Sequence, residues 1–199
     1  MAAGNSLILV VSDSHGNVPL LTAVLEWAQA AGGGKAHAFK SAVFLGDGAD
    51  DIPAASAQAG FAAQWFKVRG NLDSNFLIPD TLVLEIKDTQ DDSVSGSTNS
   101  RKLFMTHGNR FGVDMGGLTI AAAAKNAGAE AALFGHTHVP YNAVLNGIFL
   151  LNPGSIGRSR SDAGPTFAVL ECPAKGPLSA RFFCLVSRGR KNVVKELEL

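Results

Sequence analysis

Apolar and polar residues alternate in blocks over the first part of the chain. An apolar run at Leu7–Val11 ends at Ser12, and leucine and valine then recur at helical spacing from Pro19 to Ala28. Proline is favoured in the first turn of a helix, and the three glycines at 32–34 are typical of a helix end. This segment is therefore predicted to form a buried strand, a loop and a helix.

The same order of elements recurs immediately downstream. Ala42–Leu45 has the apolar character of a second strand, an alanine-rich helix is predicted over Pro53–Ala63, and Trp65–Val68 is predicted to be a third strand. Strands that alternate with helices usually pair in parallel through right-handed crossovers. The first third of the chain therefore indicates an α/β fold.

The remainder of the chain is predicted to be richer in strands. A helix is expected over Leu118–Ala127, and Asn146-Gly147 between two apolar pairs predicts a type I′ hairpin turn. The polar stretch Asp88–Arg101 is expected to be the mobile tip of another hairpin. Beyond residue 134 we expect an antiparallel half. The further predicted strands are Thr81–Ile86, Lys102–Thr106, Ala131–Phe134, Thr166–Glu171, Leu178–Val186 and Val193–Leu197.

Together these elements predict an α/β fold with two packed mixed β-sheets flanked by helices, an αββα sandwich. The chain has 199 residues with neither an internal repeat nor an evident linker, so we expect a single domain over residues 1–199. Apolar residues make up 46% of the sequence, which is enough for one sizeable core.

Charge and hydropathy narrow the classes of function. Lysine plus arginine and aspartate plus glutamate number 17 each, so no overall field attracts nucleic acid or an anionic membrane. Every apolar stretch is shorter than the roughly 18 residues of a membrane span. The basic residues at 188–195 lack interleaved aromatic residues, which favours a solvated strand over a nucleic-acid contact. We expect a cytoplasmic protein in which Cys172 and Cys184 are reduced core thiols.

Polar side chains follow directly after five of the predicted strands. Ligands of open α/β sheets collect at the carboxyl ends of the strands. Residues two apart on an extended segment point the same way, so closely spaced pairs can face one cavity. Neighbouring glycines allow the backbone to approach a ligand closely. The seven donors that we expect to converge are Asp13, His15, Asp47, Asn71, His107, His136 and His138.

This set of donors indicates metal chemistry. Carboxylates, imidazoles and one amide, without a thiolate, disfavour an iron–sulfur cluster or a structural zinc site and are compatible with Mn, Fe, Zn, Ni or Mg. One ion rarely needs so many donors. Two divalent ions bridged by a carboxylate would lie roughly 3.5 to 4 Å apart, the spacing used for in-line displacement at phosphorus.

Six short strings carry these donors in a fixed order: Asp13-Ser14-His15-Gly16, Gly46-Asp47-Gly48-Ala49-Asp50, Gly70-Asn71-Leu72-Asp73, Thr106-His107-Gly108, Gly135-His136-Thr137-His138 and Asn152-Pro153-Gly154-Ser155. The chain thereby resembles the calcineurin-like metallophosphoesterase superfamily, and more closely its small bacterial and archaeal phosphodiesterase branch. One string alone would be weak, but six in family order across most of the chain are very specific.

The resemblance implies a binuclear metal-dependent phosphodiesterase that acts on small-molecule phosphodiesters, with manganese the favoured metal. A hydroxide between the two ions would attack phosphorus in line, and Asp47, Asn71 and His107 would be the catalytic residues. Asn71, Asn109 and Arg160 would bind the substrate. One ion would be held by Asp13, His15, Asp47 and His138, and the other by Asp47, Asn71, His107 and His136, so that Asp47 bridges them.

The chain departs from the family pattern at two positions. Many relatives carry histidine at the position of Leu72, and the small branch often carries cysteine, so leucine removes the usual donor of a proton to the leaving oxygen. This implies acidic leaving groups, as in aryl phosphodiesters, or water as the acid. Asn109 replaces a second histidine, which leaves recognition of phosphate charge more dependent on Arg158 or Arg160.

Three other polar residues have less definite interpretations. Asp50 and Asp73 are each either a support for the ligands or an ordinary carboxylate of a loop or helix cap. His37, in the glycine-rich turn after the first helix, is expected at the surface.

A second class of function is a non-catalytic or weakly catalytic scaffold, similar to the retromer subunit of the same fold, whose metal-site pattern is degraded. Here no predicted ligand is missing, which favours catalysis. Exposed strands in the antiparallel half offer an edge through which a homo-oligomer could form.

Overall fold

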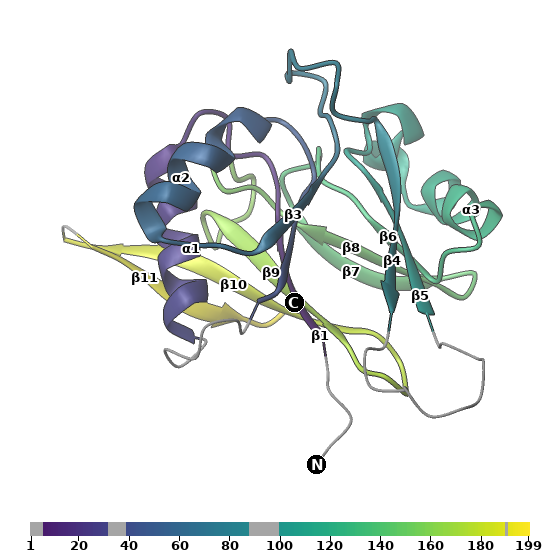
Figure 1. The fold of residues 1–199 in the computed structure, drawn as a ribbon. Helices are drawn as coiled ribbons and strands as arrows, with labels where there is room; N and C mark the ends of the chain where they lie inside the picture. The colour runs from purple at the N-terminus through teal and green to yellow at the C-terminus, as the bar shows by residue number, and fades with distance from the viewer. Residues whose placement is uncertain (1–5, 32–38, 88–99, 190) are drawn as a thin grey trace.

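The computed structural model describes residues 6–31, 39–87, 100–189 and 191–199, and Figure 1 traces them. His37 and residues 88–99 of the expected hairpin tip lie outside these ranges. The helices are α1 (Val18–Ala31), α2 (Ile52–Ala59) and α3 (Leu118–Asn126), with short 3₁₀ helices η1 (Ala49–Asp51), η2 (Asn109–Phe111) and η3 (Val113–Met115).

The strands of the described residues form two mixed sheets. The first runs β11-β10-β9-β1-β2-β3 and the second β4-β5-β6-β8-β7. Their bounds are β1 (Ser6–Val11), β2 (Ser41–Phe44), β3 (Gln64–Lys67), β4 (Thr81–Lys87), β5 (Ser100–Thr106), β6 (Ala131–Leu133), β7 (Pro140–Leu145), β8 (Ile148–Pro153), β9 (Thr166–Cys172), β10 (Ser179–Arg188) and β11 (Lys191–Leu197).

The burial of β1 explains the first apolar run of the sequence. This strand pairs in parallel with β2 and antiparallel with β9, so it lies inside its sheet. Ile8 and Val10 belong to the core between the two sheets, whereas Leu9 and Val11 pack beneath the helices, as the two-residue period of a strand requires. A strand covered on both faces must be apolar throughout.

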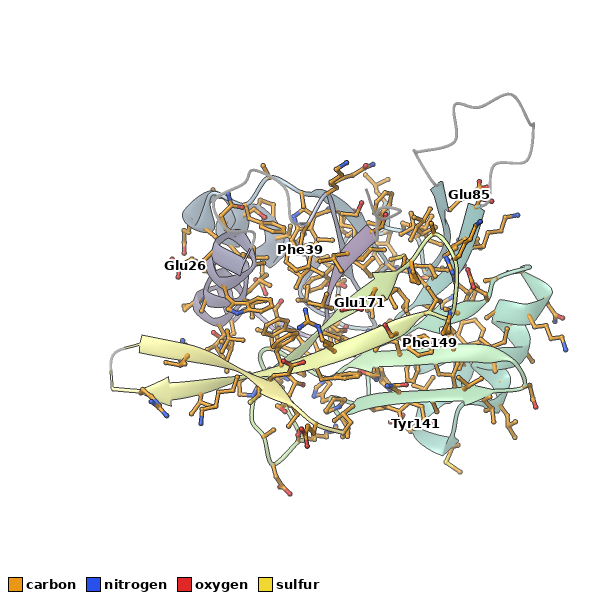
Figure 2. The ribbon with its side chains drawn as sticks, turned by 90° about the horizontal axis from the view of Figure 1, so that it is seen from below. Glu26, Phe39, Glu85, Tyr141, Phe149 and Glu171 are labelled. Atoms are coloured by element: carbon orange, nitrogen blue, oxygen red, sulfur yellow. The ribbon has the colours of Figure 1, made fainter. Side chains whose placement is uncertain are left out.

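Helices cover the outer face of each sheet. α1 and α2 lie together on the first sheet, and α3 lies on the second, on the opposite side of the molecule (Figure 1). Phe39, labelled in Figure 2, is buried in the cluster under α1, where its ring lies 6.4 Å from that of Trp27. The expected αββα sandwich is therefore confirmed.

Two expectations need correction, one about the end of a helix and one about the pairing of the later strands. α2 ends at Ala59 rather than Ala63, because Gly60 adopts a left-handed conformation (φ 64°) that closes the helix. The strands after β6 do not form one antiparallel half. β7 and β8 extend the second sheet, with β8 parallel to β6, whereas β9 to β11 return to the first sheet. Because β9 is buried along nearly its whole length, it fits inside a sheet and not at an exposed edge.

The turn between β7 and β8 has the expected conformation. Asn146 and Gly147 both have positive φ, 53° and 80°, which confirms the type I′ turn between β7 and β8.

None of the helices in the described ranges is long and apolar enough to span a lipid bilayer.

Candidate metal centre

The predicted metal ligands share an unusual backbone conformation. Residues other than glycine rarely adopt positive φ, and when they do the strain is often stored at functional sites. Six such residues occur among the described positions, and one of them is Asn146 of the hairpin turn. The other five are all predicted ligands: Asp13 (φ 55°), His15 (47°), Asp47 (57°), His136 (71°) and His138 (62°).

Backbone hydrogen bonds hold these loops against one another. Asp13 N–H donates to Gly46 O at 2.9 Å, and His15 N–H donates to Asp47 O at 3.0 Å, so the loops after β1 and β2 are joined directly. The loop after β6 is joined to the loop after β5, because Gly135 N–H donates to His107 O at 2.9 Å. The strained conformations are thus stabilised by contacts between segments far apart in the sequence.

Asp13, His15 and His138 form the first cluster of donors, within 4.8 Å of one another. Asp13 is fully buried, and its Oδ1 accepts no hydrogen bond from the described residues. This oxygen lies 3.1 Å from His138 Nε2 and 3.6 Å from His15 Nε2. Three potential ligand atoms therefore surround a point that a cation can occupy.

The second nitrogen of His138 fixes the direction of its lone pair. Nδ1 lies 2.7 Å from Arg158 O, and a carbonyl can only accept, so Nδ1 carries the hydrogen. Nε2 of the neutral ring then directs its lone pair at the Asp13 carboxylate. Protonated Nε2 would donate to the Asp13 carboxylate, and this favoured contact is the main reason that the pKa of His138 is raised, whereas burial lowers the pKa of His15.

His107 is held in the same way in a second cluster with Asp13 and Asp47. Its Nδ1 donates to Leu45 O at 2.7 Å, which leaves Nε2 facing Asp47 Oδ2 at 3.6 Å. His136 Nδ1 lies 3.3 Å from His107 Nε2 and adds a fourth donor to this side. Asp13 belongs to both clusters, whereas the resemblance assigns the shared position to Asp47.

Asp114 is a partner of His136 that sequence reasoning did not find. Its Oδ2 lies 3.1 Å from His136 Nε2, so the outer nitrogen donates to a carboxylate and Nδ1 turns inward. Metal-binding histidines are usually oriented by such an acceptor on the other ring nitrogen. No local signal could have identified Asp114, because the contact joins η3 to the loop after β6.

Asp73 supports the loops, which decides between its two interpretations. Its carboxylate accepts hydrogen bonds of 2.8 to 3.1 Å from the N–H groups of Asp47, Gly48, Ala49 and Gly70. Burial alone would raise the pKa of Asp73, but these four bonds outweigh it and hold the pKa below its ordinary value.

Asp50 is exposed, and the carboxylate that supports the first cluster is its neighbour Asp51. Asp51 Oδ2 accepts hydrogen bonds from Ser14 Oγ and from Gly16 N–H. The sequence offered two adjacent aspartates without a sign of which would turn toward the loop after β1, because that depends on the path of η1.

Glycine is required where the carboxylates approach the backbone. A Cβ on Gly70 would lie 2.0 Å from Asp47 Oδ1, and a Cβ on Gly135 would lie 2.1 Å from Ser12 Oγ. Either contact would displace the groups that position the two buried aspartates. The string 152–155 also helps to position Asp13, because Ser155 Oγ donates to Asp13 O at 2.8 Å.

The remaining predicted residues lie at the rim of the clusters. Asn71 and Asn109 line the same surface hollow, with a volume of about 230 Å³. Arg160 is exposed, and its N–H donates to His138 O at 3.1 Å. Leu72 has an exposed side chain, and its N–H donates to Asp47 Oδ1 at 2.8 Å. The structure therefore gathers the imidazole and carboxylate donors, whereas the two asparagines line a hollow that contains none of these donors.

The chain belongs to the calcineurin-like phosphoesterase superfamily, whose domain model matches residues 7–175. This confirms the resemblance and places the protein in a metal-dependent family. The chain is 32% identical over 103 residues to the probable metallophosphoesterase YsnB of Bacillus subtilis, an alignment that spans 52% of this chain and only 54% of YsnB. It is 26% identical over 176 residues to the phosphodiesterase YfcE of Escherichia coli K12, covering 82% of this chain and 86% of YfcE.

Solved structures share the fold at lower identity. A predicted phosphoesterase from Streptococcus pneumoniae TIGR4 superimposes with a TM-score of 0.66 and 22% identity over 98% of this chain and 100% of its own. Vps29 of Entamoeba histolytica, solved with zinc, has a TM-score of 0.67 and 19% identity over 96% of this chain and 98% of its own. The metallophosphoesterase fold is thus common to all three.

Asp73→Ala is expected to destabilise the protein by at least about 2 kcal/mol, because it leaves four backbone N–H groups without their charged acceptor. Asp50→Ala, at a neighbouring exposed carboxylate, is expected to change stability by less than about 0.5 kcal/mol. Urea unfolding followed by tryptophan fluorescence measures both. Equal effects of the two substitutions would show that Asp73 does not hold the loops.

Proposed function

We propose that this protein is a binuclear metal-dependent phosphodiesterase. The observation that carries the proposal is the inward direction of the imidazole lone pairs of His107 and His138. Each ring donates its outer N–H to a backbone carbonyl and turns Nε2 toward a buried carboxylate, Asp47 or Asp13. Lone pairs facing anionic oxygens repel one another unless a cation lies between them, so the donor set fits a metal ion.

Seven donors are more than one ion needs, so we divide them between two ions as the resemblance implies. Oxygen and nitrogen ligands without a thiolate suit manganese, although iron, zinc, nickel or magnesium share this preference in part. Bound divalent ions would supply Lewis-acid activation of water and neutralise the charge of the phosphate. We assign Asp13, His15, Asp47 and His138 to one ion, and Asp47, Asn71, His107 and His136 to the other.

The residues at the rim are assigned to the substrate. Asn71 and Asn109 line one hollow, and their amides can donate hydrogen bonds to phosphate oxygens. The positive charge of Arg160 is close enough to His138 to oppose part of the rise in the pKa of that ring, so it can also attract an anionic ester. A small-molecule phosphodiester suits this arrangement. A cytoplasmic location fits the two cysteines, which are buried and free.

A scaffold is the second candidate, because the likeness to Vps29 covers 98% of that chain. In that case the clusters would hold metal for structural reasons or not at all. The edge strands from the part of the chain beyond residue 134, β11 of the first sheet and β7 of the second, would serve a homo-oligomer in either case.

Catalysis and scaffolding predict different outcomes for Asp47→Asn. The purified protein is expected to contain divalent metal by inductively coupled plasma analysis and to hydrolyse bis-p-nitrophenyl phosphate with added manganese. Loss of the Asp47 charge should lower this activity by roughly 100-fold or more, since it removes a ligand. Asp50→Asn is the matched control and should leave the rate unchanged. Absence of activity with every metal, unaltered by Asp47→Asn, would favour the scaffold.

Asp114→Ala is expected to weaken manganese binding by about 10- to 100-fold, because His136 loses the acceptor that orients it. Asp162→Ala, at an exposed loop carboxylate, serves as the control and should bind manganese like the wild type. Titration of manganese against a chelating indicator measures both affinities. If the two variants bind equally well, the contact between Asp114 and His136 has no role in the metal site.

Leu72 offers no proton to a leaving group, so the rate should depend steeply on leaving-group pKa. Across aryl phosphodiesters from nitrophenyl to phenyl esters, kcat is expected to fall by more than roughly tenfold. Leu72→His should flatten this dependence by supplying an acid beside Asn71. Leu77→His places the same ring at a more exposed position of the same loop and should not. A flat dependence in the wild type would refute the role given to Leu72.

A further inference from the structure

The loop between β3 and β4 presents an aromatic ring to solvent in an ordered conformation. In Figure 1 this loop projects beyond the two sheets. Phe76 is 81% exposed, although the loop is closed at its base by a hydrogen bond from Arg69 N–H to Pro79 O and anchored by the buried Ile78. Exposure of a large apolar ring costs free energy in water, so a contact that covers the ring would be favourable.

One face of the Phe76 ring is backed by a fixed cation. The guanidinium carbon of Arg69 lies 4.6 Å from the centroid of the ring, within the range of a cation–π contact. Arg69 is itself held, because its Nε donates to Asp80 Oδ1 at 2.9 Å. The exposure of Phe76 leaves the opposite face of the ring open for a second planar group.

Phe76 shares its hollow with residues that we assign to the phosphate. The hollow of about 230 Å³ is lined by Arg69, Asn71, Phe76, Asn109 and Arg110, among others. Typical sites for complete drug-sized ligands are larger, about 300 to 1,000 Å³, so this hollow suits one group of a substrate. A phosphate held beside Asn71 would place an ester group within reach of the Phe76 ring.

The charged side chains that line the hollow are paired within the protein, which suits a neutral ring. Asp80 is paired with both arginines, Arg69 and Arg110, the latter through a contact of 2.7 Å between Nη1 and Oδ2. Asp73 is occupied by its four backbone N–H donors.

From these contacts we infer that the hollow is an aromatic subsite, in which Phe76 stacks on an aryl or nucleobase group esterified to the phosphate. The inference rests on the proposed phosphodiesterase function and narrows its substrate class to aromatic phosphate esters. Stacking on an aromatic side chain is tolerant of the identity of the ring, so both sources share this chemistry. Phe76 acts on specificity and takes no part in bond cleavage.

Calorimetric binding to the manganese-loaded protein tests this subsite without turnover. Phenyl phosphate and thymidine 5′-phosphate are expected to bind about tenfold or more tightly than inorganic phosphate and glycerol phosphate, as one stacked ring implies. Phe76→Ala should abolish this difference, Phe76→Trp should retain it, and the adjacent Leu77→Ala should behave as the wild type. A preference for only one of the two aromatic ligands identifies the aryl or the nucleobase source. Equal binding of all four ligands to the wild type, or an unchanged preference in Phe76→Ala, overturns the inference.

Kinetics with matched substrates separates this inference from the proposed function. Phe76→Ala should raise KM about tenfold for the p-nitrophenyl ester of thymidine 5′-phosphate with little change in kcat. Hydrolysis of glycerophosphocholine, followed by ³¹P NMR, should be unaffected. An aromatic preference in binding without turnover of any diester would refute the phosphodiesterase and leave the subsite intact. Equal losses for both substrates would instead mean that Phe76 acts on the loop as a whole.

Discussion

The burial of the Asp13 carboxylate is the constraint on which the rest of this structure depends. An ionised group without solvent is costly unless it is paired, yet Oδ1 accepts no hydrogen bond from the described residues and faces the nitrogens of His15 and His138. Its other oxygen accepts from Ser12 Oγ and His136 N–H. Oδ2 is thus hydrogen-bonded within the protein, whereas Oδ1 faces the interior of the site. A cation there would offset both the buried charge and the strain of the surrounding loops.

Hydrogen bonds from residues around the two clusters explain how the five predicted ligands with positive φ are stabilised together. Asp73 accepts hydrogen bonds from the loop after β2 and from the turn after β3, and Asp51 accepts hydrogen bonds from the loop after β1. Outer acceptors, the carbonyls of Leu45 and Arg158 and the carboxylate of Asp114, turn three imidazoles inward. The orientation of the candidate metal ligands therefore depends on residues outside the two clusters.

The aromatic hollow lies outside the two donor clusters, but it shares residues with the loops that support them. Gly70 and Asp73 belong to both, since they position Asp47 on one side and line the hollow on the other. Under the proposed function, a change in the loop from Asn71 to Phe76 would alter which ester is preferred while the donors stay in place. Specificity on a loop and chemistry on strand ends is a common division in α/β folds.

By itself the sequence determined the strands, the turn at Asn146-Gly147 and the identity of the converging imidazole and carboxylate donors. These depend on local periodicity and on residue types at strand ends, which short segments carry. The tertiary structure decided where β7 to β11 pair, that Gly60 ends α2, that Asp51 rather than Asp50 supports the loop, and that Asp114 meets His136. Such choices depend on contacts between segments far apart in the chain. No local pattern records them, because their free energy arises only when both segments are already in place.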